Sequence, residues 1–207
     1  MQERLRLLRD GVRDASWLAG LEETMAEEGT ALTVSRLDAI VRLNEELSSR
    51  GAEGAFPCAH LALKDALQSR ANEPAALRDA LAASRERDAE AGRTLAGPHL
   101  ADLEVRHTVK RMDARDCSTG EQKALLISIV LANAWLQKKR HDGLSPLLLL
   151  DEIAAHLDAA RRAALFEEIL ALGAQAWLTG TDKSLFAPLS GRAHFFSITA
   201  GQFAAQD

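Results

Sequence analysis

The sequence predicts an α/β fold in which a parallel-sheet core with flanking helices is preceded by a helical arm. Two observations support this prediction. Short apolar segments alternate with helical patterns after residue 117, and this alternation is typical of parallel sheets. Ala, Leu and Arg recur throughout the chain, while aromatic residues make up only 4% of it and Tyr is absent, so helix should dominate.

The composition is that of a globular protein. Of the 207 residues, 47% are hydrophobic and 27% are charged, with a formal net charge of -5. This acidic balance argues against a chain that wraps nucleic acid over its whole surface. Cys58 and Cys117 lie far apart in the sequence, which excludes a disulfide framework and indicates a reducing compartment. No apolar run reaches the roughly 18 residues of a membrane span, and no secretory signal precedes the first helix, so we expect a cytoplasmic protein without a membrane partner.

The first 50 residues predict two helices. Leu5, Leu8 and the apolar residues that follow recur at helical spacing, and Gly29 is expected to end this first pattern. Thr33 or Ser35 can open a second helix, which Gly51 and Gly54 would end. Charged residues occupy the other faces, so we expect an exposed helical arm rather than a deeply buried bundle.

The next stretch predicts a strand, a helix and a strand. Residues 59–64 alternate in polarity as a short strand does. Residues 72–89 form a helical pattern that Asn72 can cap and in which Pro74 suits the first turn. Residues 103–109 then read as a second strand.

From residue 117 onward, apolar strands alternate with helices. Helices are expected over 121–139 and 157–172, and strands over 147–150, 174–179 and 193–199. The strand at 147–150 consists of four leucines, which implies that both of its faces are covered.

The strand of leucines ends in two carboxylates, Asp151 and Glu152. Ligands of parallel sheets bind beyond the carboxyl ends of the strands. An Asp at this place can hold a hydrated Mg²⁺, and the adjacent Glu can orient an attacking water. The alternative is a buried strand that ends in a solvated acidic turn.

A possible anion site opens the helix that precedes this strand. Ser118 can cap the helix, Gly120 allows close backbone approach, and the first-turn N–H groups have no partners within the helix, so the geometry suits a phosphate. The alternative is a plain capping box with Glu121. A third signal is Asp158, which follows His156 and precedes the next helix; its alternative reading is a simple helix cap.

The order and spacing of these motifs resemble the second half of an ABC-type ATPase, with its signature motif, Walker B strand and D-loop. Within that superfamily the chain is most similar to the RecF family of SMC-like recombination and repair ATPases. Three features carry this resemblance: Gln122-Lys123 at the end of the signature, Gly92-x-Thr94-x-x-Gly97-Pro98-His99-x-x-Asp102, and the segment 175–181. The resemblance divides the chain into a helical arm over 1–91 and a C-terminal ATPase lobe over 92–207.

The resemblance implies a role for each matching residue. The signature residues would contact, in trans, the γ-phosphate of ATP held by a second subunit. Asp151 would assist Mg²⁺, Glu152 would be the catalytic base, and Asp158 would belong to the D-loop at the subunit interface. Thr179 or Thr181 would occupy the switch position, where many ABC ATPases have a His. The signature residues with this role are Ser118, Thr119, Gly120 and Gln122.

A motif that such ATPases need is absent from the sequence. No Gly-x-x-x-x-Gly-Lys-Ser/Thr occurs, so the chain cannot cradle ATP phosphates in the usual way. Since RecF-like proteins carry this motif near their N-terminus, we expect the chain to correspond to the C-terminal portion and to bind no ATP or Mg²⁺ alone. Leu100 and Ala101 also depart from the Arg and acidic residue that the family often has, so no phosphate or DNA contact is assigned there.

The family's partners are expectations of the same kind. They are duplex DNA at gap junctions, RecR-type recombination mediators and a second subunit in an ATP-dependent homodimer that supports recombinational gap repair and the SOS response. Phosphate contacts need only local positive charge. Two basic clusters are candidates, with a solvated surface as the alternative for each: Arg106, Lys110, Arg111 and Arg115, and Lys138, Lys139 and Arg140.

Two other functions fit the same motifs. An ABC transporter fragment would need a membrane-coupling partner, and the long charged arm before the signature argues against it. A non-enzymatic binding module could keep the lobe after losing ATP function. Cys58-x-His60 could be half of a metal site, but no matching second half follows.

Overall fold

The computed structural model describes residues 1–11, 15–50, 55–65 and 73–206, without the side chains of His156 and Gln206. The chain forms two compact units: Met1–Glu45 with His60–Arg106, and Glu46–Ala59 with His107–Asp207. We call these the helical unit and the α/β unit. The predicted boundary between the helical arm and the ATPase lobe, between residues 91 and 92, falls inside the helical unit. The assignment of these two roles to the two segments stays a prediction.

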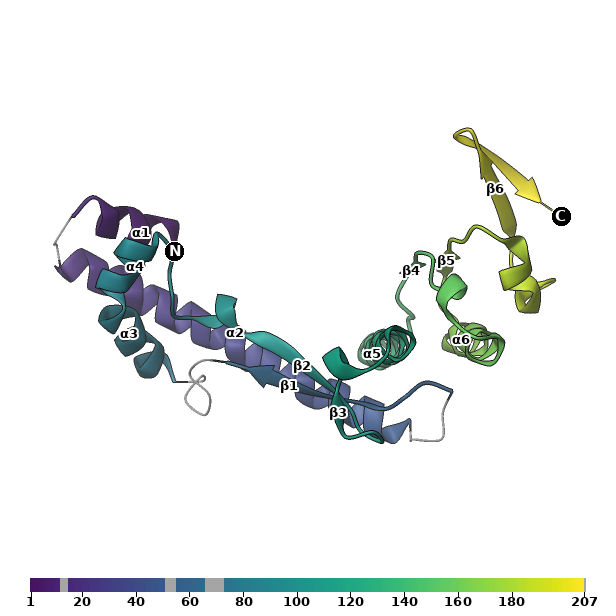
Figure 1. Cartoon of the computed structure of the whole chain (residues 1–207), viewed down its shortest axis with the longest axis horizontal. Helices are drawn as coiled ribbons and strands as arrows, with labels where there is room; N and C mark the ends of the chain where they lie inside the picture. The colour runs from purple at the N-terminus through teal and green to yellow at the C-terminus, as the bar shows by residue number, and fades with distance from the viewer. Residues whose placement is uncertain (12–14, 51–54, 66–72, 207) are drawn as a thin grey trace. The chain divides into compact units, whose positions relative to one another are not determined.

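The helical unit contains the elements before residue 107 (Figure 1). Its long helix α2 continues into the α/β unit at Glu46, and β1 and β2 cross the same division at their ends. β1 and β2 are neighbours in one sheet. The elements are α1 (Gln2–Arg9), α2 (Ala15–Ser49), β1 (Ala59–Lys64), α3 (Pro74–Ala83), α4 (Arg85–Ala91), the 3₁₀ turn Pro98–Leu100 and β2 (Asp102–His107).

Gly29 does not end a helix, contrary to the sequence prediction. α2 runs through it as one helix of 35 residues. A Cβ atom at Gly29 would lie 2.7 Å from Cδ2 of Leu77 and 3.3 Å from Cδ of Pro98. The glycine therefore allows α3 and the turn at Pro98 to pack against α2. The expected ends at Gly51 and Gly54 lie outside the described residues.

The helix expected over 72–89 is two helices, because the chain bends at Ser84. Ser84 is the C-cap of α3 and the N-cap of α4, and its hydroxyl donates to Asp88 at 2.8 Å. Pro74 is at the first turn of α3, as expected. Asn72, the expected cap, lies outside the described residues.

A buried charge network ties α1 to the rest of the helical unit, although the sequence predicts an exposed arm. Arg4 is 0% exposed. Its guanidinium donates to Glu22 of α2 at 2.8 Å, to Asp88 of α4 at 2.7 Å and to the carbonyl of Leu81 at 2.7 Å. Because each contact is a hydrogen bond to a group of another helix, the network fixes the place of α1.

The α/β unit contains a two-stranded parallel sheet covered by two helices. β4 pairs with β5 in the register Leu148↔Ala176 and Leu150↔Leu178, and α6 forms the crossover between them. An antiparallel hairpin follows; its second strand is one that the sequence analysis missed. The elements are β3 (Met112–Asp113), α5 (Thr119–Arg140), β4 (Leu148–Leu150), α6 (Ala159–Leu172), β5 (Ala176–Leu178), β6 (Phe195–Thr199) and β7 (Gln202–Gln206), with 3₁₀ turns at Ala114–Asp116, Ala154–His156 and Lys183–Leu189.

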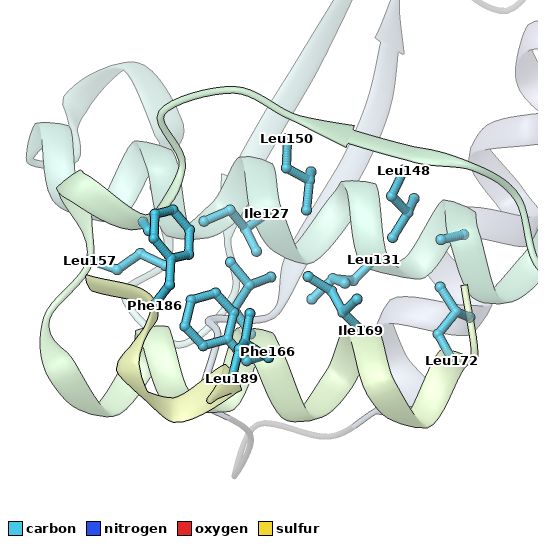
Figure 2. Close-up of a cluster of buried hydrophobic side chains, with 13 residues drawn as sticks. Ile127, Leu131, Leu148, Leu150, Leu157, Phe166, Ile169, Leu172, Phe186 and Leu189 are labelled. Atoms are coloured by element: carbon cyan, nitrogen blue, oxygen red, sulfur yellow. The ribbon is translucent and has the colours of Figure 1, made fainter. Parts of the chain in front are cut away.

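The core of this unit lies between the sheet and helices α5 and α6. Figure 2 shows Leu148 and Leu150 directed toward Ile127 and Leu131 of α5, with residues of α6 completing the cluster. In Figure 1, α5 and α6 are seen nearly end-on, side by side, with β4 on one side of them. Three of the four leucines, Leu148–Leu150, form the expected strand β4, and Leu147 lies directly before it.

The expectation that both faces of this strand are covered is wrong for the described chain. Leu147 is 56% exposed and Leu149 is 72% exposed, because both helices pack on the opposite face. The aromatic rings of Trp177 and Phe196 stack on this open side with centroids 6.3 Å apart. We call this surface the outward apolar face; its residues are Leu147, Leu149, Trp177, Phe196, Ile198 and Phe203.

Candidate functional site

A capping box forms the N-terminal end of α5. Ser118 is the N-cap; its hydroxyl accepts from the backbone N–H of Glu121 at 3.4 Å. The carboxylate of Glu121 accepts from the backbone N–H of Ser118 at 3.1 Å and from its hydroxyl at 2.9 Å. The capping box that the sequence analysis gives as one reading of this segment is therefore present.

The ammonium of Lys110 also contacts the carboxylate of Glu121. The pKa of Glu121 is lowered to about 2, chiefly by the hydrogen bond from Lys110 and then by the hydrogen bonds from Ser118. Glu121 therefore stays ionised at neutral pH. The sequence analysis gives Lys110 as a DNA candidate or as part of a solvated surface, and no local pattern connects it with Glu121.

Gly120, Gln122 and Thr119 are the other signature residues at this end of α5. A Cβ atom at Gly120 would meet nothing within 4 Å, so packing inside the chain does not require this glycine. The side-chain amide of Gln122 donates to the carbonyl of Cys117 at 3.2 Å and to that of Arg115 at 3.3 Å. Thr119 is the exposed first residue of α5.

The acidic end of β4 is connected to the end of β5. The hydroxyl of Thr179 donates to Asp151 and accepts from the backbone N–H of Glu152 at 3.0 Å. Glu152 has φ +51°, a left-handed conformation that is uncommon outside glycine. Such backbone strain is found more often at functional sites. The structure therefore brings together three sequence-predicted residues: Asp151, Glu152 and Thr179.

These residues offer ligands that Mg²⁺ accepts. Magnesium is usually held by one or two carboxylates together with phosphate oxygens. Asp151 is exposed and supplies one carboxylate, so it fits Mg²⁺ in combination with nucleotide phosphates. Among residues 1–11, 15–50, 55–65 and 73–206, no three His, Cys, Asp or Glu side chains gather as a metal site of their own.

The cap of α5 and the end of β4 lie at the same end of the α/β unit. In Figure 2, Leu150 lies near Ile127, whereas Leu148 lies toward Leu131. β4 therefore runs opposite to α5, and its carboxyl end points toward the N-terminal end of that helix. The Ser118 cap and the carboxylates of Asp151 and Glu152 therefore lie on one rim of the α/β unit, beyond the carboxyl end of the strand, where ligands of parallel sheets bind.

Asp158 has the geometry of an ordinary helix cap. Its carboxylate accepts from the backbone N–H of Arg161 at 2.8 Å and begins α6. Asp158 is exposed, and its contact with another subunit stays a prediction. Thr181, the second switch candidate, is exposed beyond the end of β5.

The switch segment depends on the glycine between its two threonines. A Cβ atom at Gly180 would lie 2.8 Å from both Cε2 and Cζ of Phe186, which is in the core. We expect Gly180→Ala to lower the free energy of unfolding of the α/β unit by about 1–3 kcal/mol, since the ring must move. Urea unfolding followed by circular dichroism measures this effect.

Gly120→Ala is the matched control, because its new methyl group meets open space. It should leave the free energy of unfolding unchanged or raise it by up to about 1 kcal/mol, since alanine favours a helix over glycine. Equal losses for both variants would contradict the packing role of Gly180.

Several cations of the two basic clusters have partners inside the chain. Lys138 donates to the carbonyl of Leu172 at 2.7 Å and lies 5.1 Å from the centroid of the Trp135 ring. Lys139 contacts Glu46 at 2.5 Å, while Arg140 is exposed at the end of α5. Arg106 belongs to the helical unit and Lys110 and Arg111 to the α/β unit, and their common DNA patch stays a prediction.

A pocket of about 510 Å³ lies elsewhere in the α/β unit, between α5, α6 and the segment after α2. Arg50 and Glu168, which contribute to its lining, pair with each other at 2.5 Å. Glu167, also in its lining, pairs with Arg192 at 2.6 Å. These charges are therefore used within the chain. Cys58 is among its lining residues, but none of the signature, Walker B, D-loop, switch or basic-cluster candidates is. None of the described helices is long and apolar enough to cross a membrane.

Curated relatives and solved structures resemble this chain, whereas no family model matches it. DNA replication and repair protein RecF of Brucella abortus (strain 2308) is 50% identical over 208 residues, covering 98% of this chain and 54% of the relative. The protein of that name in Agrobacterium fabrum (strain C58 / ATCC 33970) is 49% identical over 214 residues, covering 99% and 56%. The chain therefore spans about half the length of these relatives.

Two solved structures share the fold. One is of the recombination mediator protein RecF-ATPrS in the RecFOR pathway, with a TM-score of 0.78 and 21% identity over 100% of this chain and 55% of that chain. The other is of RecF-ATP in the same pathway, with a TM-score of 0.76 and 20% identity over 99% and 55%.

Proposed function

Because this chain belongs to the RecF family, as its 50% identity over 98% of its length shows, we propose that it supplies the signature, Walker B and D-loop parts of a RecF-like DNA replication and repair protein. The observation that carries the proposal is the common rim: the Ser118 cap and the Asp151–Glu152 end of β4 lie at one end of the α/β unit. Membership of this family also argues against the alternative that the chain is a fragment of an ABC transporter.

The proposed mechanism is a nucleotide held between two subunits. Ser118, Thr119, Gly120 and Gln122 contact the γ-phosphate of ATP on the opposite subunit, where backbone N–H groups at a helix start favour an anion. The open space at Gly120 supports close approach of such a ligand.

On the other part of the rim, residues of this chain act on its own subunit's nucleotide. Asp151 contributes to Mg²⁺ binding, and Glu152 accepts a proton from the attacking water. Thr179 orients both, since it contacts Asp151 and the backbone of Glu152. The Mg²⁺ ion, when bound, neutralises charge on the phosphates.

The partners follow from the family. The ATP-closed dimer holds duplex DNA at gap junctions, works with RecR-type mediators in the cytoplasm and supports recombinational repair. Arg140 is one of the exposed DNA candidates, whereas Lys138 is half-buried and its ammonium already donates to the carbonyl of Leu172.

The outward apolar face requires a cover in the complete protein. Parallel sheets are normally buried on both faces, and here Leu149 is 72% exposed. The relatives are about twice as long as the chain, which covers 54% of the first of them. We assign the cover to the remaining part of a RecF chain, which is also where the missing phosphate-binding loop is expected.

Association in trans tests the nucleotide role. The labelled chain is titrated with the RecF protein of Brucella abortus loaded with ATPγS, and fluorescence anisotropy reports binding. We expect at least tenfold tighter association with ATPγS than without nucleotide. Ser118→Ala should weaken the ATPγS complex about tenfold or more, because a hydrogen bond to a charged group is lost.

The matched control is Ser35→Ala, which removes a hydroxyl that bonds the carbonyl of Ala31 within α2 at 2.9 Å. It should leave association unchanged. Association that does not depend on nucleotide would refute the proposal and favour a binding module without ATP function.

A further inference from the structure

The hydroxyl proton of Ser118 is already used within the chain. A serine hydroxyl has one hydrogen to donate, and here it is directed to Oε2 of Glu121 at 2.9 Å. For Ser118 to donate to a phosphate oxygen, this bond must open. The hydrogen bond to Glu121 therefore affects whether the Ser118 hydroxyl can donate to ATP, as the proposed function requires.

Glu121 also brings a negative charge to an end of the helix that is meant to receive an anion. A carboxylate next to a phosphate is unfavourable by Coulomb's law unless a cation offsets it. Its two oxygens divide their contacts: Oε2 accepts from Ser118 twice, and Oε1 contacts the ammonium of Lys110. Lys110 is thus the cation that the structure places on this carboxylate.

We propose that Lys110 is a positioning residue for the ATP contact of the signature cap, where its ammonium offsets the charge of Glu121 through Oε1, and that it is not a DNA ligand. This inference rests on the proposed function. Lys110 lies between β2 and the start of α5, eleven residues before Glu121, so the pair joins two segments that no helical or strand period connects.

The same association assay measures this role in the intact chain. Lys110→Met should weaken ATPγS-dependent binding to the Brucella abortus RecF protein about threefold to tenfold. Association without nucleotide and binding of the chain to a labelled duplex should stay unchanged. Lys110→Arg keeps the positive charge, so we expect it to retain most of the affinity.

A double variant separates charge offset from a general structural effect. Glu121→Gln removes the negative charge but keeps a residue that can complete the capping box. If Lys110 acts by offsetting Glu121, adding Glu121→Gln to Lys110→Met should restore binding to within about twofold of the wild-type chain. Such recovery is the coupling that a double-mutant cycle detects.

Lys64→Met is the control, since Lys64 forms a more exposed Lys–Glu pair with Glu104 at 3.3 Å in the helical unit. It should not change association, and thermal unfolding should be the same for all variants.

Unchanged ATPγS-dependent binding of Lys110→Met, or failure of Glu121→Gln to restore it, overturns the inference about Lys110 alone. Weaker duplex binding by Lys110→Met with normal association also overturns it and makes Lys110 a DNA ligand. If the wild-type chain shows no nucleotide dependence, or Ser118→Ala has no effect, the proposed function fails and this inference fails with it.

Discussion

Arg4→Met is expected to lower the free energy of unfolding of the helical unit by about 3–5 kcal/mol. Arg4 is 0% exposed and donates to Glu22, Asp88 and the carbonyl of Leu81. Methionine fills a similar volume, so the loss comes from charge and hydrogen bonding. Asp88, itself 0% exposed, would keep a carboxylate in the interior without its cation. Urea unfolding followed by helical circular dichroism measures the change.

The control is Arg42→Met. Arg42 pairs with Asp38 at 2.9 Å, but both side chains are about half exposed, at 46% and 57%. Exposed pairs contribute about 0.2–1 kcal/mol, so this variant should be nearly as stable as the wild type. Similar losses for both variants would contradict the special role of the buried network.

The stability that this network contributes should also depend on pH. Burial raises the pKa of Glu22, but the hydrogen bonds and charges of Arg85 and Arg4 outweigh it, so the pKa lies below the usual 4.5. A carboxyl with a lowered pKa stabilises the fold above its unfolded pKa, and this contribution is lost as pH falls through the folded value. The difference between wild type and Arg4→Met should therefore shrink as pH falls below about 4.5.

Lysine at both Leu149 and Ile198 is expected to change the chain from a self-associating species to a predominantly monomeric one. These side chains are 72% and 74% exposed on the outward apolar face, so lysine there leaves the core intact. Without the remaining part of a RecF chain to cover it, this face should bury its apolar surface against a second copy. Light scattering over a concentration series gives the mass directly.

Leu144→Lys is the matched control for this pair. Leu144 is 75% exposed but lies outside the outward apolar face, in the loop after α5. It should not change self-association. A wild-type chain that stays monomeric at high concentration would contradict the prediction and remove this support for a missing cover.

Local patterns in the sequence were enough for most elements of the α/β unit. Ser118 with Glu121, and Asp158 before α6, are caps formed by residues within one helical turn, so their hydrogen bonds can be read from spacing. The leucine run predicted β4 because a short apolar segment after a proline and before two carboxylates has few alternatives. The candidate site residues came from the order of these same segments.

Contacts between distant segments were not readable in this way. The sequence alone determined where most helices and strands form and which residues cap them, because those interactions act within a few residues. Only the tertiary structure decided that Gly29 lies inside a helix, that Arg4 is buried between two carboxylates, that Lys110 contacts Glu121 and that β4 is covered on one face. Each of these depends on a partner distant along the chain, and packing against that partner outweighs the weak local preference of the residue itself.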